Sequence, residues 1–349
     1  MGRTWAVSAA LLAASTYACL YVAALVPLPI WAGASAARFD QRGDPPFVLL
    51  HLLVYFVDLT AREAYFRESH GWEWLPRLVL LVALVFATYL ATRAVDWPRV
   101  VVVQAGAVLL AAGVADLVGL AVVLVRSDAV GDLAVDLARS GIFWTYDALF
   151  FGFLCAATVV VGACLLRLSW TATGRRSDAL APETGGGPGR TGNLALACVL
   201  PVVALALLGG ASSYSGKSEQ EVRLADEVAG VVLHPRLQLR PQDDPEAGFG
   251  EVVGADRWVP GSLVAVLSLV VLWVLLRWVL AGVRTTAGPA AVLIAVWGVV
   301  VVASTVGGVV DALAFPLSSF AVPHATRFGV LWGWLPAVIA VIGLRRRAA

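Results

Sequence analysis

The chain consists mainly of long apolar runs separated by shorter polar segments. A transmembrane helix needs about 20 consecutive apolar residues, and eight runs approach or exceed this length. They cover residues 5–31, 76–95, 99–125, 142–167, 193–210, 261–282, 289–310 and 327–344. The pattern predicts an all-α polytopic membrane protein with about eight transmembrane helices. The first run is longer than the roughly 7–15 apolar residues of a signal peptide, so we expect this helix to be retained.

Composition supports a membrane location. Only 14% of the residues are charged and 60% are hydrophobic, whereas a soluble domain carries roughly 25% charged residues. The net charge of +1 provides no basic surface of the kind that nucleic-acid binding requires. We therefore expect the lipid bilayer, and no nucleic acid, as a partner. Lys217 is the only lysine, and this preference for arginine, with abundant Ala, Val and Gly, is typical of GC-rich bacterial genomes.

The arginines around the predicted spans indicate an orientation. With eight spans, the segments that carry most of them lie on one side of the membrane, and positively charged short loops remain in the cytoplasm. These residues are Arg93, Arg99, Arg167, Arg175, Arg176, Arg190, Arg277, Arg284, Arg345, Arg346 and Arg347. We predict a multi-pass protein of the cell membrane with cytoplasmic N- and C-termini. The long segments 32–75 and 211–260 then lie outside.

Short strings recur along the chain. EAYFRE at 63–68 returns as EAGFGE at 246–251, and VLLH at 48–51 returns as VVLH at 231–234 with the same offset. After a slip of one residue, Arg93 also matches Arg277. These matches predict two tandem four-helix repeats. Because four is an even number, both copies have the same topology, so the repeats are parallel.

The repeat gives a domain organisation. The first four-helix repeat covers 1–170 with outer segment 32–75, and the second covers 193–349 with outer segment 211–260. Residues 171–192 are rich in glycine, proline and polar residues, which is typical of a flexible cytoplasmic linker. Small residues at 106–113 and 304–308 allow helix backbones to approach closely. We expect the third and seventh helices to lie at the centre and join the two halves.

The outer segments carry a matched set of polar residues, namely His51, Glu63, Glu68, His234, Glu246 and Glu251. Imidazole and carboxylate groups together can bind a metal or transfer protons. Their spacing is not that of a known metal site, since on one helix His51 and Glu63 would lie about 18 Å apart. The alternative interpretation is a set of solvated residues inherited by duplication, so a metal remains undetermined.

Few acidic residues occur within the predicted spans. Asp116 lies in the outer half of the third helix, and Asp147 and Asp311 lie near the outer ends of the fourth and seventh. A carboxylate within a membrane is costly and indicates a functional site, although Asp147 and Asp311 are close enough to the interface to be solvated. Gln104 is expected to form a hydrogen bond between helices. His324 and Arg327 at the start of the eighth helix form either an outer ion-pair cluster or a solvated loop.

The motifs leave three classes of function open. The sequence contains no Walker motif, GxSxG or HExxH, and its four cysteines all lie in apolar runs, so no cofactor is identified. We expect a non-catalytic subunit whose outer segments bind another membrane or extracytoplasmic protein. The alternatives are a secondary transporter using Asp116, or a membrane enzyme with an outer His/carboxylate site. No helix-breaking Pro or Gly pair is recognised at mid-membrane, which argues against the broken-helix site of many transporters.

Overall fold

The described residues form helices joined by short turns, and one pair of residues, Val95 and Val283, bridges two of these turns. The computed structural model describes residues 6–15, 74–96, 98–126, 157, 161–162, 164–165, 188–212, 255–284, 286–314 and 321–348. The helices are α4 (Trp74–Ala94), α5 (Val100–Arg126), α7 (Pro188–Ser212), α9 (Ala255–Leu280), α10 (Pro289–Ala314), α11 (Ala321–Trp332) and α12 (Trp334–Ala348). Residues 6–15 form a further short helix. The all-α prediction is therefore confirmed.

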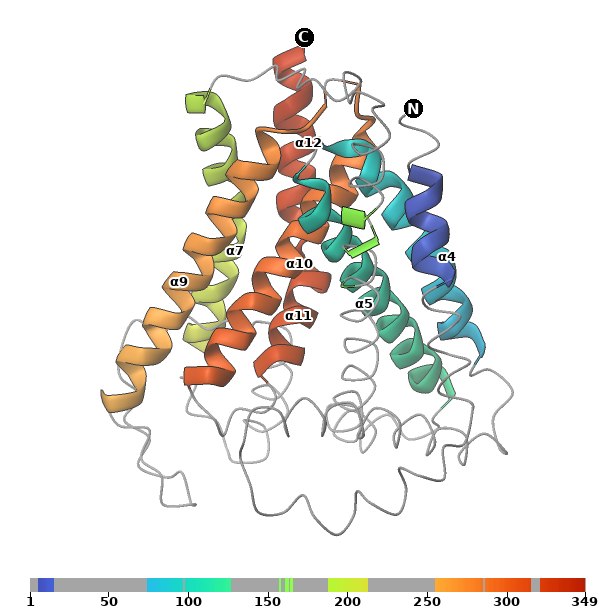
Figure 1. Cartoon of the computed structure of the whole chain (residues 1–349). Coiled ribbons are helices and arrows are strands. Elements are labelled where there is room, and N and C mark those ends of the chain that lie inside the picture. Colours follow the sequence, from blue (N-terminus) through green and yellow to red (C-terminus); the bar gives the residue numbers. More distant parts are fainter. Residues whose placement is uncertain are drawn as a thin grey trace.

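The helices stand side by side in one bundle (Figure 1). α4 and α9 run toward the end of the bundle where both chain termini lie, and α5 and α10 run away from it. α11 and α12 then return the chain to that end. We call it the arginine end because it carries Arg93, Arg99, Arg277, Arg284, Arg345 and Arg346 at the helix ends and turns. The other end is called the opposite end.

Several helices are long and apolar enough to cross a membrane. They contain the stretches Thr191–Leu208, Leu263–Leu280 and Pro289–Val310, and α11 with α12 makes a fourth candidate if the bent pair is one span. α4 and α5 coincide with the predicted spans 76–95 and 99–125. Most of the predicted spans 5–31 and 142–167 lies outside the described residues. The described part of the chain thus has the architecture of a helical membrane protein.

Apolar side chains cover the outside of the bundle. On α9 the exposed residues Leu263, Val266, Leu267, Val270 and Val274 follow helical spacing and form one stripe. In water such a stripe would favour aggregation, whereas in a bilayer it contacts acyl chains. The opposite face of α9 packs into the core through Leu272, Leu276 and Val279. The helix is apolar all round because both its faces avoid water.

The centre of the bundle is the crossing of α5 and α10. A Cβ added to Gly106 would overlap the backbone of Gly298, and a Cβ on Gly298 would lie 2.9 Å from the carbonyl carbon of Gly106. Only glycine permits backbones to approach this closely. Buried valines and alanines surround the crossing, among them Val103, Ala107, Val299 and Val300. The prediction that these two helices pack together at the centre is confirmed.

The last predicted span is broken. α11 and α12 meet at Gly333 with a bend of 42°, where Pro336 lacks the N–H that would continue the ladder and crowds the preceding turn. Trp297 of α10 donates its indole N–H to the carbonyl oxygens of Gly329 and Val330, at 3.2 and 3.1 Å. No helix-breaking Pro or Gly pair was recognised from the sequence, whereas Gly333 and Pro336 lie three residues apart at this bend.

Candidate functional site

Most sequence-predicted site residues lie outside the described part of the chain. These are His51, Glu63, Glu68, Asp147, His234, Glu246 and Glu251. Asp116 and Asp311 belong to α5 and α10 respectively, and their side chains are also outside the described set. The structure therefore fixes the helical position of Asp116 and Asp311 and leaves the predicted outer His/Glu set as a prediction.

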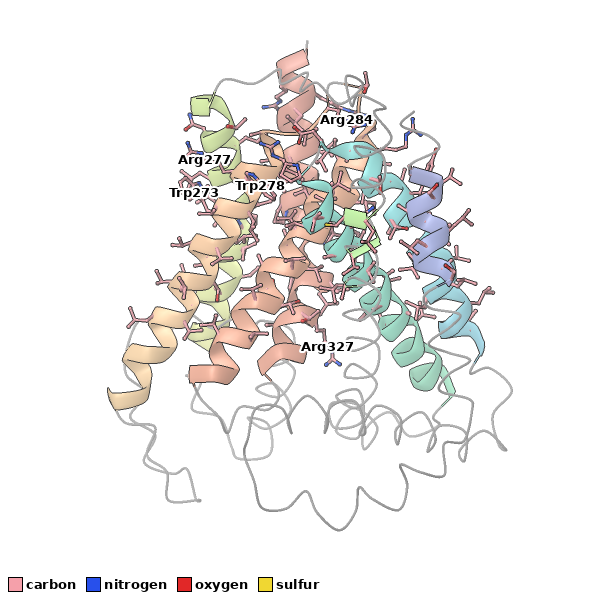
Figure 2. The ribbon with its side chains drawn as sticks, viewed as in Figure 1. Trp273, Arg277, Trp278, Arg284 and Arg327 are labelled. Carbon is pink, nitrogen blue, oxygen red and sulfur yellow. The ribbon has the colours of Figure 1, made fainter. Side chains whose placement is uncertain are left out.

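A buried arginine marks the strongest candidate site. Arg327 of α11 has only 7% of its surface exposed, and Figure 2 shows it at the opposite end of the bundle from Arg277 and Arg284. Burying a guanidinium away from water is costly unless anionic or polar groups surround it. In a membrane protein, such a residue indicates a site for a charged ligand or a buried counter-charge.

Buried hydroxyl groups lie between α10 and α11, the helix that carries Arg327. Thr326 and Thr305 of α10 are hydrogen-bonded through their Oγ1 atoms at 2.8 Å, and both are buried. Thr305 also donates to the carbonyl oxygen of Val301 at 2.8 Å. Ser304 is buried beside Gly329, whose added Cβ would lie 3.1 Å from the serine Oγ. The α10–α11 interface therefore contains three buried hydroxyl groups, those of Ser304, Thr305 and Thr326.

Helix register relates Arg327 to the acidic positions of the described helices. Gly113 of α5 packs against Val330 of α11, because a Cβ on Gly113 would overlap the valine methyl groups. Asp116 follows Gly113 by three residues and Arg327 precedes Val330 by three. Since α5 and α11 run in opposite directions (Figure 1), both steps lead about 4.5 Å toward the opposite end. Positions 116 and 327 therefore lie at the same level of two contacting helices.

Asp311 lies farther from this level. The Thr305–Thr326 hydrogen bond sets the register of α10 against α11. From that pair, Asp311 is six residues toward the opposite end, whereas Arg327 is one residue toward the arginine end. The axial separation of positions 311 and 327 is thus about 10 Å. Among the acidic positions in described helices that pack on α11, position 116 is the one level with Arg327.

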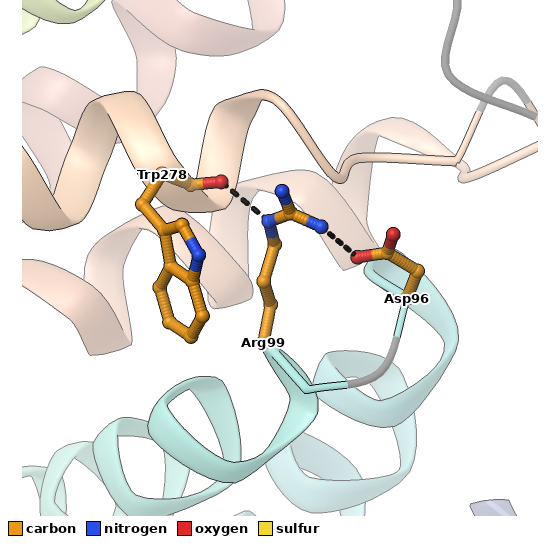
Figure 3. A network of polar contacts seen from close by, with 3 residues as sticks. All are labelled: Asp96, Arg99 and Trp278. Carbon is orange, nitrogen blue, oxygen red and sulfur yellow. Dashed lines mark hydrogen bonds and ion pairs between the residues drawn. The ribbon is translucent and has the colours of Figure 1, made fainter. Parts of the chain in front are cut away.

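A second polar network joins α4, α5 and α9 at the arginine end (Figure 3). Arg99 donates from Nε to the carbonyl oxygen of Trp278 at 2.6 Å and from a terminal nitrogen to Asp96 Oδ1 at 2.6 Å. Its guanidinium also lies 5.5 Å from the Trp278 ring centroid. The pair is partly buried, with side-chain exposures of 17% for Arg99 and 13% for Asp96. Arg99 therefore ties the α4–α5 turn to the end of α9.

Backbone hydrogen bonds join the same two turns. Val95 and Val283 form an antiparallel bridge, in which Asp96 N donates to Gly282 O at 3.1 Å and Arg284 N donates to Ala94 O at 3.0 Å. This is the non-hydrogen-bonded type of pair, in which the two Cα atoms lie close together, at about 4.5 Å. The α4–α5 and α9–α10 turns consequently form one unit at the arginine end.

Gln104 forms the predicted bond between helices. Its Nε2 donates to Thr92 Oγ1 of α4 at 3.0 Å, and Thr92 donates in turn to the carbonyl oxygen of Thr88 at 2.6 Å. All three side chains are buried, and the Gln104 Oε1 atom has no hydrogen-bond partner among the described residues. The bond fixes the packing of α5 against α4, and we regard this network as structural.

Comparisons with known proteins give no relative. No family model matches the chain, no curated protein matches it, and no solved structure matches it. Within the described ranges, no group of three or more His, Cys, Asp or Glu side chains is placed to hold a metal ion. The functional interpretation therefore depends on the buried charge and the bundle geometry.

Sequence reasoning underestimated Arg327. Its position at the start of a predicted span suggested a solvated loop, because hydropathy assigns helix ends to the interface. In the structure α11 begins at Ala321. Arg327 therefore lies within the helix, where it is buried. The sequence signal for this site was the short polar string HATR at 324–327, which lies between apolar stretches.

Proposed function

We propose that the protein is a permease of the cell membrane that carries a small charged solute, with its site at Arg327 and Asp116. The observation that supports this most is the burial of Arg327, which is only 7% exposed and belongs to a helix pair bent by 42°. Broken helices and membrane charges are features of transporter sites, since breaks release backbone polar groups for solute binding. Asp116 supplies the acidic position level with it.

Two parallel four-helix halves are part of this proposal. α4 and α9 share a direction, as do α5 and α10 (Figure 1). Arg93 lies over the ring of Tyr89, and Arg277 lies over the ring of Trp273, each in the last turn of its helix. Tyr89 corresponds to Trp273, and Arg93 corresponds to Arg277. Both correspondences have the same offset of 184 residues. This supports tandem repeats.

The orientation follows from charge. The arginine end collects exposed arginines from α4, α9 and α12, and the positive-inside rule assigns such an end to the cytoplasm. We therefore propose that both termini are cytoplasmic and that Arg327 faces the outer half of the membrane. With eight spans, four of which precede it, the linker at 171–192 also lies on the cytoplasmic side.

The direct test is solute entry into proteoliposomes. Vesicles that contain the full chain and valinomycin are placed in iso-osmotic potassium lactate, potassium phosphate, glycine or glycerol, and swelling is followed by stopped-flow light scattering. We expect wild-type vesicles to swell several times faster than protein-free vesicles in at least one charged solute, and Arg327→Gln to abolish the difference. If wild-type and protein-free vesicles swell alike in all four solutes, the permease proposal is wrong.

A partner-binding or assembly subunit is the second candidate. The hydrogen-bonded turns at the arginine end and the Gly106–Gly298 crossing favour it, because they make a rigid joint where a transporter with two moving halves needs freedom. Its proposed binding segments, 32–75 and 211–260, lie almost wholly outside the described residues. The enzyme alternative has no observation in its favour among the described residues.

A disulfide across the bridge tests whether the two halves of a permease move at the arginine end. Val95→Cys with Val283→Cys, in a background with the four native cysteines replaced, fits disulfide geometry because non-hydrogen-bonded pairs place Cα atoms about 4.5 Å apart. If the halves move at the arginine end during transport, oxidation stops solute entry and a reductant restores it. Unchanged entry after complete oxidation would restrict motion to the opposite end. The single cysteine variants under the same oxidant are the controls.

A further inference from the structure

We propose that Arg93 of α4 and Arg277 of α9 each bind the head group of an anionic phospholipid in the leaflet at the arginine end. Both side chains are exposed, each in the last turn of its helix. Among the residues that the structure describes, neither forms an ion pair with a carboxylate. The two sites lie at the other end of the bundle from Arg327, so this inference goes beyond the proposed permease function and does not depend on it.

On α4 the arginine follows an exposed apolar stripe. Val82 and Phe86 are 60% and 58% exposed, and Tyr89 and Arg93 continue the same face, since at about 3.6 residues per turn the four positions fall within about 60°. Arg93 folds back along this face. It donates to the Tyr89 hydroxyl at 3.0 Å, and its guanidinium lies 5.5 Å from the ring centroid. The charge is therefore held beside the apolar stripe, on the membrane side of its own Cα.

α9 has the same arrangement, position by position, 184 residues later. Val266 and Val270 are 48% and 49% exposed, and the guanidinium of Arg277 lies 5.4 Å from the ring centroid of Trp273. Figure 2 shows Trp273 and Arg277 near the arginine end of α9. Two helices of different sequence thus present the same order of groups, which is two exposed apolar residues, an aromatic ring and an arginine.

The length of this surface matches one lipid leaflet. Eleven residues separate Val82 from Arg93, and the same number separates Val266 from Arg277, which corresponds to about 16 Å along a helix. One leaflet contributes roughly 15 Å to the hydrocarbon core. An acyl chain can therefore lie along the stripe while the phosphate lies at the arginine. The ring between them is then at the interfacial level that tyrosine and tryptophan prefer.

The stacked guanidinium retains donors for a phosphate. Stacking uses its flat face, and the N–H groups at its edge can pair with phosphate oxygens. Arg99 provides the contrast, because it also stacks on a tryptophan, Trp278, but donates to the Trp278 carbonyl oxygen and to Asp96. With 17% exposure, Arg99 is engaged within the protein, whereas Arg93 and Arg277 face the lipid.

An anionic phospholipid fits these sites better than a zwitterionic one. Phosphatidylcholine also has a phosphate, but its choline group brings a positive charge to an end that already carries exposed Arg345 and Arg346. Phosphatidylglycerol has the phosphate without that cation, and basic groups at the ends of membrane helices attract such lipids. Inorganic phosphate would make no use of the apolar stripe.

Native mass spectrometry of the full chain in detergent measures the bound lipid. From an equimolar mixture of the dioleoyl lipids, we expect wild type to retain two molecules of phosphatidylglycerol in preference to phosphatidylcholine. Arg93→Gln and Arg277→Gln should each weaken one of the two sites about fivefold, the factor that corresponds to ~1 kcal/mol for one arginine at an anionic surface. The combined variant should weaken both sites. Arg346→Gln, at an exposed arginine of the same end, is the matched control and should retain both lipids.

Equal retention of the two lipids by wild type would overturn the proposal without reference to any variant. A loss in Arg346→Gln as large as that in Arg277→Gln would also overturn it, because the lipid would then respond only to the total charge of the arginine end.

The length of the acyl chain distinguishes a lipid site from a phosphate site. Wild type is titrated with dioleoyl and with dihexanoyl phosphatidylglycerol, and we expect the dioleoyl lipid to bind several times more tightly because only its chains cover the stripe. Equal binding of the two lipids, or displacement of the dioleoyl lipid by inorganic phosphate, would assign a site for soluble phosphate and contradict the lipid assignment.

Discussion

Gly106 of α5 and Gly298 of α10 meet so closely that neither position has room for a Cβ. The contact lies among buried valines and alanines of the main core, and it sets the distance between the two helices at the centre of the bundle. Since a glycine has no side chain that could be repacked, a larger residue at either position must push the backbones apart.

Substitution of Gly106 should therefore be costly. We expect Gly106→Ala to lower the free energy of unfolding by about 1–3 kcal/mol through overpacking, measured as a lower unfolding midpoint in detergent. Gly192→Ala in α7 is the matched control, because nothing lies within 4 Å of a Cβ there. That change should be neutral or stabilising by up to about 1 kcal/mol, through the higher helix propensity of alanine. Equal losses in both variants would contradict the close crossing.

Lysine should not replace Arg99 without a loss of stability. Arg99→Lys keeps the charge but removes the Nε–H that donates to Trp278 O while a second nitrogen reaches Asp96. We expect a loss of about 1.5–3 kcal/mol, typical of a hydrogen bond to a charged group, seen as a lower unfolding midpoint. The control is Arg93→Lys, at an exposed arginine stacked on Tyr89 of its own helix, where a change within about 0.5 kcal/mol is expected.

Removing one partner of the Thr92–Gln104 hydrogen bond should cost more stability than removing both. Thr92→Val removes the acceptor of the buried Gln104 amide, so we expect a loss of about 1–3 kcal/mol from the unsatisfied donor. Thr92→Val combined with Gln104→Met removes both polar groups and should recover most of that loss. Thermal unfolding of the single and combined variants makes the comparison. A combined variant less stable than Thr92→Val would show that Gln104 contributes through contacts other than this bond.

Topology is testable with reporter fusions. Eight spans with cytoplasmic termini place positions 180 and 348 inside, and positions 40, 135, 230 and 320 outside. Alkaline phosphatase activity should therefore appear only in the second set, and a cytoplasmic fluorescent reporter only in the first. An outside signal at position 180 would end both the eight-span proposal and the parallel repeat, because the linker could not then join two four-helix halves.

Several features followed from the sequence because they depend on local physics. Long apolar runs predicted helices that α4, α5, α7, α9 and α10 confirm with shifts of a few residues at their ends. Hydropathy needs no knowledge of neighbours, since the bilayer requires every backbone group to bond within its own helix. The small residues around Gly106 and the polar side chain of Gln104 likewise predicted close packing and a bond between helices.

The tertiary structure decided which residues meet. At the break near Gly333, Trp297 of another helix donates to the carbonyl oxygens of Gly329 and Val330. The level relation between Asp116 and Arg327 depends on the register set by Gly113 and Val330, and the joint of Val95 with Val283 depends on two turns arriving at one place. Register between helices is fixed by the shapes of side chains on both, so no periodicity within one helix could have determined it.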